Sequence, residues 1–488
     1  MKKPEDLMEK IVSLCKRRGF VYQGSEIYGG LAGTWDYGPL GVALKKNIEN
    51  LWWRYFVDSR EDMYGIDSAI LMNPKVWEAS GHVSGFSDPL IECKKCGVRF
   101  RVDHLLEQSG KTGVQGLSIQ QMADKVKSVS DIVCLECGAR NWTDVKQFNM
   151  MFKTFVGPLI SDEFRPGLQG GTESKHDVEL HYDDRNAVYL RPETAQGMFV
   201  NFKNIVDSYH PKLPFGIAQI GRSFRNEIAP RDFIFRVREL EIMEFEYFTA
   251  EGEWEKHFEY WRIEMQKWFH SLGFAPEDIK EVEIPDGERA HYSKRTTDFH
   301  FRYPHKFDEI GGLAYRTDFD LTNHIEKSAA DLRYLDPSTN EKFVPHVIEP
   351  TFGLGRHVLA VIAKAYTEDE LGGETRVVLK FPPHLAPVKA AVFPLLKNKP
   401  ELVAKAREIY IALKKEIPQT MWDDNGNIGK RYRRQDEVGT PWCITIDFDT
   451  LTDETVTIRD RDTGTQERVA LSELAAFVSS KLQAPNLK

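Results

Sequence analysis

Two Cys-x-x-Cys pairs set one part of this sequence apart from the rest. Cys93 and Cys96 form the first pair, Cys134 and Cys137 form the second, and 37 residues separate them. Two such pairs supply the thiolates of a tetrahedral Zn²⁺ site. We therefore expect residues 90–145 to be an insertion with a structural metal, because a fully thiolate-bound ion has no open position. The alternative is an insertion with reduced thiols and no metal.

Length and composition indicate a globular protein with several domains. The 488 residues allow roughly two to four domains. The content of 29 Phe, 17 Tyr and 10 Trp excludes a disordered chain. Six cysteines are too few for a disulfide framework, and we interpret Cys15 and Cys443 as buried apolar side chains. Because no apolar run approaches the ~20 residues of a membrane span, and the N-terminus mixes acids with bases, we expect a soluble, cytoplasmic protein without membrane contact.

The net charge of −9 excludes a chain coated in basic residues, but it leaves room for a local nucleic-acid site. One basic cluster stands out. It consists of Lys430, Arg431, Arg433 and Arg434, with Tyr432 among them. Positive charge suits phosphate and a ring suits an unstacked base, so the cluster is a candidate RNA contact. A solvated charged surface is the alternative.

Hydrophobic periodicity predicts the main elements of the first 380 residues. A helix is expected over 41–56, where adjacent Trp52 and Trp53 exceed what one helix face can bury alone. A short strand is expected over 67–74, ending at Pro74. The remaining expected elements are antiparallel strands over 215–227 and 235–248, a helix over 251–273 with Gly273 as its cap, a strand over 344–353 and a helix over 354–366.

Beyond a Pro-rich stretch at 380–387, strands alternate with helices, which predicts a separate α/β domain after a linker. The expected order is a strand, a helix, a strand, a hairpin turning at 462–465 and a closing helix. We divide the chain into 1–89, the insertion at 90–145, a second catalytic part at 146–380 and a C-terminal domain at 387–488.

Two constellations carry candidate chemistry. Arg225 and Glu227 end one strand of the expected hairpin, and Phe235 begins the other. An Arg can grip phosphate, a Glu can accept from an exocyclic amine and a ring can stack on a base. A solvated charged hairpin is the alternative. The second constellation runs from Glu349 to Arg356, where glycines allow close backbone approach and Arg356 begins a helix.

These elements, in this order, resemble the signature motifs of class II aminoacyl-tRNA synthetases. The segments 24–41, 71–82, 189–199 and 428–443 are similar to those of the homodimeric type of glycyl-tRNA synthetase. The resemblance implies an α+β catalytic domain with an antiparallel sheet flanked by helices, and a C-terminal α/β anticodon-binding domain. It implies glycine, ATP with Mg²⁺ and tRNA(Gly) as partners, and a homodimer with the helix over 41–56 near its interface.

The resemblance also implies roles for individual residues. Arg225 and Arg356 are the implied catalytic residues. The implied ATP-binding residues are Arg225, Asn226, Glu227, Phe235, Arg236, Val237, Arg238, Glu239, Leu240, Glu309, Ile310, Gly353, Leu354, Gly355 and Arg356. The implied glycine-binding residues are Arg101, Glu193, Leu240, Glu241, Ile242, Met243, Glu244, Glu349, Pro350, Thr351, Phe352 and Gly353. The implied tRNA-binding residues are Lys430, Arg431, Arg433 and Arg434.

Glycine has no side chain to grip, so its ammonium group must be the main handle. Glu193, Glu244 and Glu349 are the candidate acids, because buried carboxylates need a cation. Thr351 departs from the Ser that is more frequent in the family, and its extra methyl group predicts a slightly tighter pocket. Two rival interpretations are another class II synthetase and a non-catalytic, synthetase-like RNA-binding accessory protein. The acidic pocket argues against the first, and the retained ATP residues argue against the second.

Overall fold

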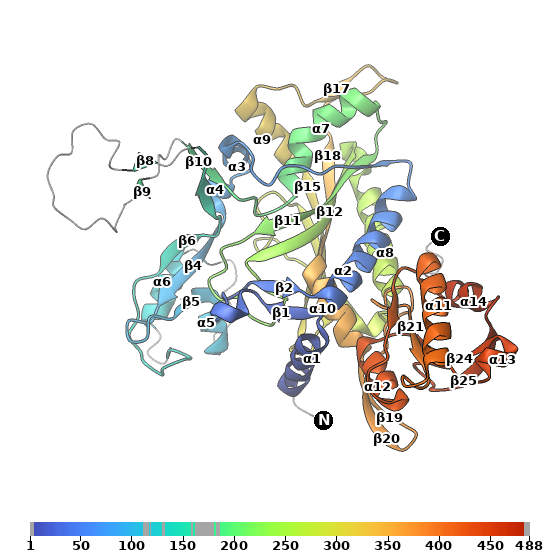
Figure 1. Ribbon diagram of the computed structural model, residues 1–488. Coiled ribbons are helices and arrows are strands. Elements are labelled where there is room, and N and C mark those ends of the chain that lie inside the picture. The colour runs from blue at the N-terminus through green and yellow to red at the C-terminus, as the bar shows by residue number, and fades with distance from the viewer. Residues whose placement is uncertain are drawn as a thin grey trace.

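The structure is a computed structural model that describes residues 4–110, 117, 119–128, 132–157, 160–161, 180–181 and 186–482. Three parts are visible in Figure 1: a large central sheet with its helices, a small sheet with α5 and α6 to one side, and a C-terminal unit at the lower right. Among the described residues no helix combines the length and the apolar character that a membrane span requires.

The central sheet has seven strands in the order β13-β14-β15-β18-β12-β11-β3. Neighbours are antiparallel except β3 and β11, which are parallel. The expected hairpin is confirmed as β11 and β12, but its strands are shorter at the turn than expected. Arg225, Glu227 and Phe235 lie in the connection between the strands and not on them. The strands are β3 (Met63–Gly65), β11 (Phe215–Phe224), β12 (Glu239–Thr249), β13 (Ile279–Glu283), β14 (Arg295–Arg302), β15 (Phe307–Thr317) and β18 (His346–Gly353).

The prediction of a strand over 67–74 is wrong. The only strand in this region is β3, which ends at Gly65. Pro74 begins the helix α3 (Pro74–Ala79) instead of ending a strand, and the side chain of Asn73 accepts a hydrogen bond from the backbone N of Lys75 at 3.0 Å. A proline whose φ is already helical suits the first position of a helix, and the short Asn side chain caps it.

Helices cover both faces of the sheet. On one face lie α2 (Pro39–Trp53), α8 (Trp254–Ser271) and α10 (Leu354–Ala365), and on the other lie α7 (Ala195–Tyr209) and α9 (Phe319–Ser328). β12 shows how the sequence divides these layers. Phe245 and Tyr247 pack in the core with α2 and α8, and Phe248 packs in the core with α7. Because strand side chains alternate, Glu244 and Glu246 lie on the α7 side with Phe248.

The predicted helix over 41–56 is confirmed as α2 and its π-helical continuation (Arg54–Asp58). Its two tryptophans differ in burial. Trp52 is 0% exposed, and its ring centroid lies 5.4 Å from Phe56 and 6.2 Å from Phe245. Trp53 packs on the backbone of Gly65 and stays half-buried. The chain therefore covers Trp52 by itself, and the place of this helix near a dimer interface stays a prediction.

The insertion has its own sheet and its own small core. The strand order is β5-β4-β6. Its elements are β4 (Ser87–Glu92), β5 (Arg99–Arg101), α5 (Val102–Gln108), α6 (Ile119–Ser128) and β6 (Lys146–Asn149). Its core contains Ile91, Val102, Leu105, Leu106, Met122 and Ile132.

The C-terminal unit is the expected mixed α/β domain. Its sheet order is β22-β21-β23-β24-β25, with β21 parallel to β22 and β23, and the remaining pairs antiparallel. Its elements are β21 (Ala390–Pro394), α11 (Pro400–Glu416), β22 (Thr420–Trp422), α12 (Ile428–Val438), β23 (Trp442–Ile446), α13 (Thr450–Asp453), β24 (Thr455–Asp460), β25 (Gln466–Ala470) and α14 (Leu474–Ser480). The periodicity did not predict α12, which carries the basic cluster.

The stretch at 380–387 is a packed connection and not an open linker. Phe381, Leu385 and Ala386 are each 0% exposed and belong to the core that contains α2 and α10. The side-chain nitrogen of Asn47 donates to the carbonyls of Leu385 and Ala386, both at 3.0 Å. Removing the C-terminal domain would therefore uncover part of this interface.

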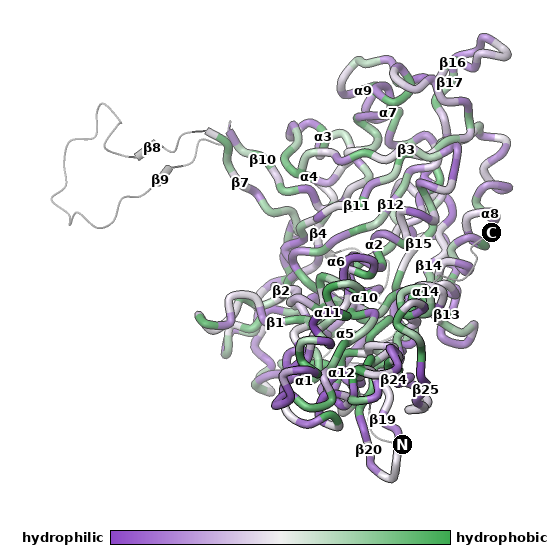
Figure 2. Tube along the Cα trace, turned by 45° about the vertical axis from the view of Figure 1, so that its right-hand side comes forward, coloured by the Kyte–Doolittle hydropathy of each residue, from purple (hydrophilic) through white to green (hydrophobic). Residues whose placement is uncertain are grey.

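A second connection comes from the hairpin of β19 (Tyr366–Leu371) and β20 (Glu374–Leu379), which extends from the end of the molecule near α12 (Figures 1 and 2). The remaining described elements are α1 (Pro4–Arg18), β1 (Val21–Gln23), β2 (Trp35–Tyr37), α4 (His82–Gly85), β7 (Lys153–Phe155), β8 (Ile160–Ser161), β9 (Leu180–His181), β10 (Ala187–Tyr189), β16 (Tyr334–Leu335), β17 (Lys342–Phe343) and single turns of 3₁₀-helix at Glu26–Tyr28, Glu251–Glu253 and Pro276–Asp278.

Candidate active site

Two adjoining cavities lie over the carboxyl end of β11 and the middle of β12. The larger has a volume of about 660 Å³ and the smaller about 390 Å³. Both are lined by Arg225, Ile242, Glu309 and Thr351, so they form two compartments of one site. Of the predicted ATP residues, the larger compartment is lined by Arg225, Glu227, Phe235, Arg236, Val237, Glu239, Leu240, Glu309, Gly353, Gly355 and Arg356.

Arg225 lies at the boundary between the compartments. Its Nε donates to the carbonyl of Pro192 at 3.0 Å, which fixes the guanidinium at the end of β11. Its charged group lies 5.6 Å from the ring centroid of Phe86. The guanidinium group of Arg225 is fixed at the boundary, so it can contact anionic groups in both compartments at once.

Glu227 offers an unused acceptor in the larger compartment. The residue is 7% exposed, and its Oε2 is buried without a hydrogen-bond partner among the described residues. The nearest cation is Arg236, whose Nη1 lies 3.5 Å away, beyond good hydrogen-bond geometry. A buried acceptor left open in this way suits a ligand that donates, such as an exocyclic amine.

Arg356 and Phe235 meet on the opposite wall. The guanidinium of Arg356 lies 4.5 Å from the ring centroid of Phe235, and Nη1 of Arg356 is 3.0 Å from both the carbonyl and Oε2 of Glu309. The charge of Arg356 is the main cause that lowers the pKa of Glu309. Arg356 lies in the first turn of α10 (Leu354–Ala365), as the glycine-rich junction predicted, so its charge adds to the positive end of the helix.

Four predicted ATP residues do not line either compartment. Ile310 and Leu354 are each 0% exposed in the core. The backbone N of Asn226 donates to Met150 O at 2.8 Å, and Nη1 of Arg238 donates to Ala32 O at 2.7 Å. In this structure these groups support the walls of the cavity and do not face its space.

The smaller compartment brings together the predicted acids. Glu193, Glu244 and Glu349 all line it, with Ile242 and Thr351. Glu244 accepts hydrogen bonds from Oγ1 of Thr194 at 2.5 Å and from Oγ1 of Thr351 at 2.8 Å. The Thr351 hydroxyl thus positions a pocket carboxylate, which is a role that a Ser at this place would share.

Arg316 is a central cation that the sequence analysis missed. Its Nη1 donates to Oε1 of Glu349 at 2.7 Å, and its Nε and Nη2 donate to the two oxygens of Asp320, each at 2.8 Å. The side chain is 1% exposed and lies 3.7 Å from the ring centroid of Tyr292. The available signal was the spacing of Arg316 and Asp320, four residues apart across the start of α9.

The acids differ in their protonation. Burial raises the pKa of Glu349 to about 8, although Arg316 opposes this shift. Burial alone would raise the pKa of Glu193. The neighbouring His82 and Arg316 have the larger opposite effect and hold the pKa of Glu193 well below its usual range. Nε2 of His82 lies 3.2 Å from Oε2 of Glu193. At neutral pH Glu193 is therefore an anion, whereas Glu349 titrates just above neutrality.

Other predicted glycine residues lie elsewhere. Leu240, Glu241 and Gly353 line the larger compartment only. Met243 and Phe352 are 0% exposed in the core, and Pro350 lines neither compartment. Arg101 is not brought to the pocket, because its guanidinium pairs with Asp88 at 2.9 Å and with Asp103 at 2.6 Å in the insertion.

The four cysteines of the insertion come together as the spacing predicted. Their sulfur atoms lie within 4.8 Å of one another, and Cys93–Cys137 and Cys96–Cys134 are each separated by 3.6 Å. Zn–S bonds of about 2.3 Å in a tetrahedron would place sulfurs roughly 3.8 Å apart. Each pair is followed by a glycine with positive φ, at +73° for Gly97 and +68° for Gly138. The donor set and its spacing therefore fit Zn²⁺.

The basic cluster on α12 divides into two kinds of residue. Lys430, Arg433 and Arg434 line a separate surface cavity of about 850 Å³. Arg431 is 1% exposed, and its guanidinium donates to the carbonyls of Pro394, Asp424 and Gly426. The expectation that Arg431 contacts RNA is therefore corrected, because the side chain is buried and both terminal nitrogens donate to backbone carbonyls inside the domain.

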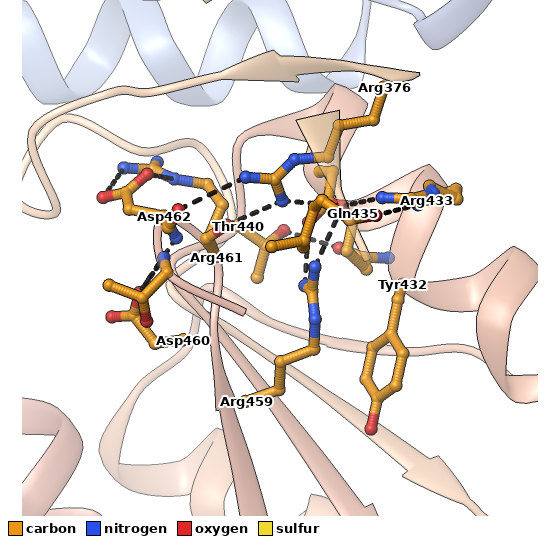
Figure 3. Close-up of polar contacts among 12 residues, drawn as sticks. Arg376, Tyr432, Arg433, Gln435, Thr440, Arg459, Asp460, Arg461 and Asp462 are labelled. Atoms are coloured by element: carbon orange, nitrogen blue, oxygen red, sulfur yellow. Dashed lines mark hydrogen bonds and ion pairs between the residues drawn. The ribbon is translucent and has the colours of Figure 1, made fainter. Parts of the chain in front are cut away.

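Arg433 and Arg434 also have acidic neighbours. Arg434 Nε donates to Asp423 at 2.9 Å, and Arg433 Nη2 lies 3.2 Å from Glu374 Oε2. Figure 3 shows Arg433 beside the network that links Arg376, Arg459 and α12. Both arginines remain about one-third exposed, at 34% and 28%.

Comparison with known proteins identifies the family. Residues 177–365 match the class II tRNA synthetase core domain (G, H, P, S and T), and residues 389–481 match the anticodon binding domain. The chain is 50% identical over 485 residues to a glycine–tRNA ligase from Alkaliphilus oremlandii, covering 98% of this chain and 99% of that protein. It is 49% identical over 481 residues to a glycine–tRNA ligase from Bacillus cereus, with 98% and 99% coverage. A glycine–tRNA ligase from Geobacillus thermodenitrificans is 50% identical, with 97% of each chain covered. The chain therefore belongs to the glycine–tRNA ligase family of class II aminoacyl-tRNA synthetases.

Proposed function

We propose that this chain is a glycine–tRNA ligase that activates glycine with ATP in the two adjoining compartments. The observation that carries the proposal is Arg225, which lines both the acidic compartment and the larger one. The reaction needs a cation at the point where the amino-acid carboxylate meets the α-phosphate, because negative charge accumulates there.

In the first step, glycine's ammonium group lies among Glu193, Glu244 and Glu349, and its carboxylate extends toward Arg225. A carboxylate oxygen attacks the α-phosphorus of ATP, and the bond from that phosphorus to the bridging oxygen of the β-phosphate breaks. The products are glycyl-adenylate and pyrophosphate. Arg225 neutralises the phosphoryl oxygens during the attack.

The adenosine part occupies the larger compartment. The open Oε2 of Glu227 accepts from the adenine amine, and Phe235 supplies a ring face for the base. Arg356 moves from its ring contact to the phosphate chain, where its charge assists departure of pyrophosphate. Asn226, Val237, Arg238, Glu239, Leu240 and the backbone of 353–355 shape this compartment.

Mg²⁺ belongs to the same proposal. Glu309 and Asp298 both line the smaller compartment, and they supply the hard oxygen donors that this ion prefers. Burial and the neighbouring Glu309 raise the pKa of Asp298 to about 7, so a cation between them would relieve repulsion. When bound, Mg²⁺ neutralises phosphate charge on ATP.

In the second step, a terminal ribose hydroxyl of tRNA(Gly) attacks the carbonyl carbon of glycyl-adenylate, and AMP leaves. Lys430, Arg433 and Arg434 on the C-terminal domain contact the anticodon arm.

The proposal has four further parts. It includes a structural Zn²⁺ on the cysteines, a twofold homodimer, a cytoplasmic location and the division of the chain into 1–89, 90–145, 146–380 and 387–488. Light scattering tests the dimer, because a mass near the chain's 56.1 kDa would contradict it.

ATP–pyrophosphate exchange, scanned over amino acids, tests the function. Glycine should support exchange, whereas alanine and serine should fail in a pocket closed around an ammonium group. Comparable exchange with threonine, proline or histidine would indicate another class II synthetase. No exchange with any amino acid would favour a non-catalytic RNA-binding protein.

A further inference from the structure

Glu246 on β12 is a fully buried acid that no step above uses. It is 0% exposed, and neither carboxylate oxygen has a hydrogen-bond partner among the described residues. β12 and β18 are antiparallel, and Glu244 pairs with Thr351. In the same register, Glu246 on β12 therefore lies opposite Glu349 on β18. One oxygen each of Glu244, Glu246 and Glu349 lies within 4.8 Å of the others. These three residues are the glutamate cluster.

Acids outnumber cations around the glutamate cluster. Asp320 and Glu193 act electrostatically on this cluster and bring the carboxyl groups to five. Arg316 is the guanidinium that contacts the cluster, and Arg225 and Arg289 also line the compartment. None of these cations is hydrogen-bonded to Glu246, and burial and like charge both disfavour its ionisation.

The contacts indicate which acid stays neutral. Glu349 accepts a hydrogen bond from Arg316 at 2.7 Å, and Glu244 accepts from the hydroxyl groups of Thr194 and Thr351. Glu246 has no such donor. Burial, followed by the negative charge of Glu349, raises the pKa of Glu246 well above its usual range.

We propose that Glu246 is a positioning residue of the glycine pocket that keeps its proton at neutral pH and donates it in a hydrogen bond to Glu349. Glu349 is then held from two sides, by Arg316 and by Glu246, next to glycine's ammonium group. The charge of that ammonium group favours the ionised form of Glu349 when glycine binds. This inference rests on the proposed function, since it assigns the cluster to glycine binding.

The test compares two variants of nearly equal size. Glu246→Gln keeps a neutral hydrogen-bond donor, whereas Glu246→Leu removes it. We expect the glycine KM in exchange at pH 7 to be about tenfold or more higher for the Leu variant than for the Gln variant, as expected when a hydrogen bond to a charged group is lost. The ATP KM should be the same in both, because the larger compartment is unchanged. Equal glycine KM values in the two variants would overturn the proposal.

Infrared difference spectroscopy gives a readout that does not depend on activity or on the Leu variant folding. The wild-type spectrum near neutral pH should contain carbonyl bands of protonated carboxylic acids, and Glu246→Gln should lose the contribution of Glu246. An unchanged set of bands in the Gln variant would show that Glu246 is ionised and would overturn the proposal. If the wild-type protein activated no amino acid, the proposed function would fail, and the infrared comparison would still decide whether Glu246 holds a proton.

Discussion

Arg376 on β20 donates from Nη1 to Oδ2 of Asp436 on α12 at 3.1 Å, and each side chain is 1% exposed. Asp436 also accepts from both terminal nitrogens of Arg459 on β24, at 2.8 and 3.1 Å. One buried carboxylate therefore joins the β19–β20 hairpin to the C-terminal sheet. The two parts of the chain are connected by a specific ion-pair network as well as by the packed stretch at 380–387.

Asp436→Asn should destabilise the protein strongly. It leaves the buried guanidinium of Arg459 without its counter-charge, and removing one partner of a buried pair typically costs about 3–5 kcal/mol. Arg376 keeps its second partner, Asp369. Thermal unfolding should show a large drop in the midpoint. Asp331→Asn is the matched control, because its partner Arg333 and Asp331 itself are both exposed. A drop no larger than the control's would show that the network contributes little.

Arg225→Ala and Arg356→Ala should each reduce glycine-dependent exchange by about 10²–10³-fold, because each removes a fixed cation from developing phosphate charge. Circular dichroism should show that both variants fold. Arg302→Ala, which alters an exposed arginine on β14 outside both compartments, is the control. Near-normal exchange in either variant would remove that arginine from the proposed site.

The insertion should carry about one zinc per chain when the protein is purified without chelator. Cys93→Ser should lower the zinc content, since one of four thiolates is lost. Cys443→Ser is the control, because that cysteine is buried in the C-terminal domain. Metal analysis that detects no zinc in the wild-type protein would reject the assignment.

The contribution of Glu349 to the free energy of unfolding should fall as pH rises from about 5 to 8. The folded state keeps a proton on Glu349, whose pKa is raised to about 8, whereas the unfolded chain ionises that carboxyl near its ordinary value. This contribution is therefore lost progressively until pH passes the folded pKa, and the loss levels off above it. Urea unfolding across this range should show that the stability of the wild type relative to Glu349→Gln decreases as pH rises. A difference that does not change with pH would mean that Glu349 is ionised throughout.

Lys430→Glu should raise the tRNA KM in aminoacylation and weaken its dependence on salt, because fewer counterions are released on binding. Glycine-dependent exchange should not change. Lys415→Glu places the same charge change on an exposed residue of α11 and serves as the control. Equal tRNA KM values for both variants would withdraw the RNA role of this surface.

The sequence alone determined the parts of the protein that depend on local pattern. Apolar periodicity predicted α2, the β11–β12 hairpin and α8, because a buried face requires its own spacing. The cysteine spacing predicted a cluster, since two short knuckles need only approach one another. The motif around Arg225 and Glu227 predicted a hairpin site because its residues adjoin two paired strands, after the end of β11 and before the start of β12.

Tertiary structure decided the rest. The spacing of Arg316 and Asp320 allows an ion pair, but only the place of β15 in the central sheet, with α9 and β18 beside it, makes Arg316 the cation of the acidic pocket. Arg431 and its neighbours share one helix, and rotation about the helix axis puts Arg431 inside and Lys430 outside. Glu246 is a second example. Alternation along β12 determines which face of the sheet its side chain lies on, but its lack of a hydrogen-bond partner among the described residues depends on all the elements packed around it. Local pattern fixes which way a side chain faces along its own element, whereas burial and charge partners are set by other elements far away in the chain.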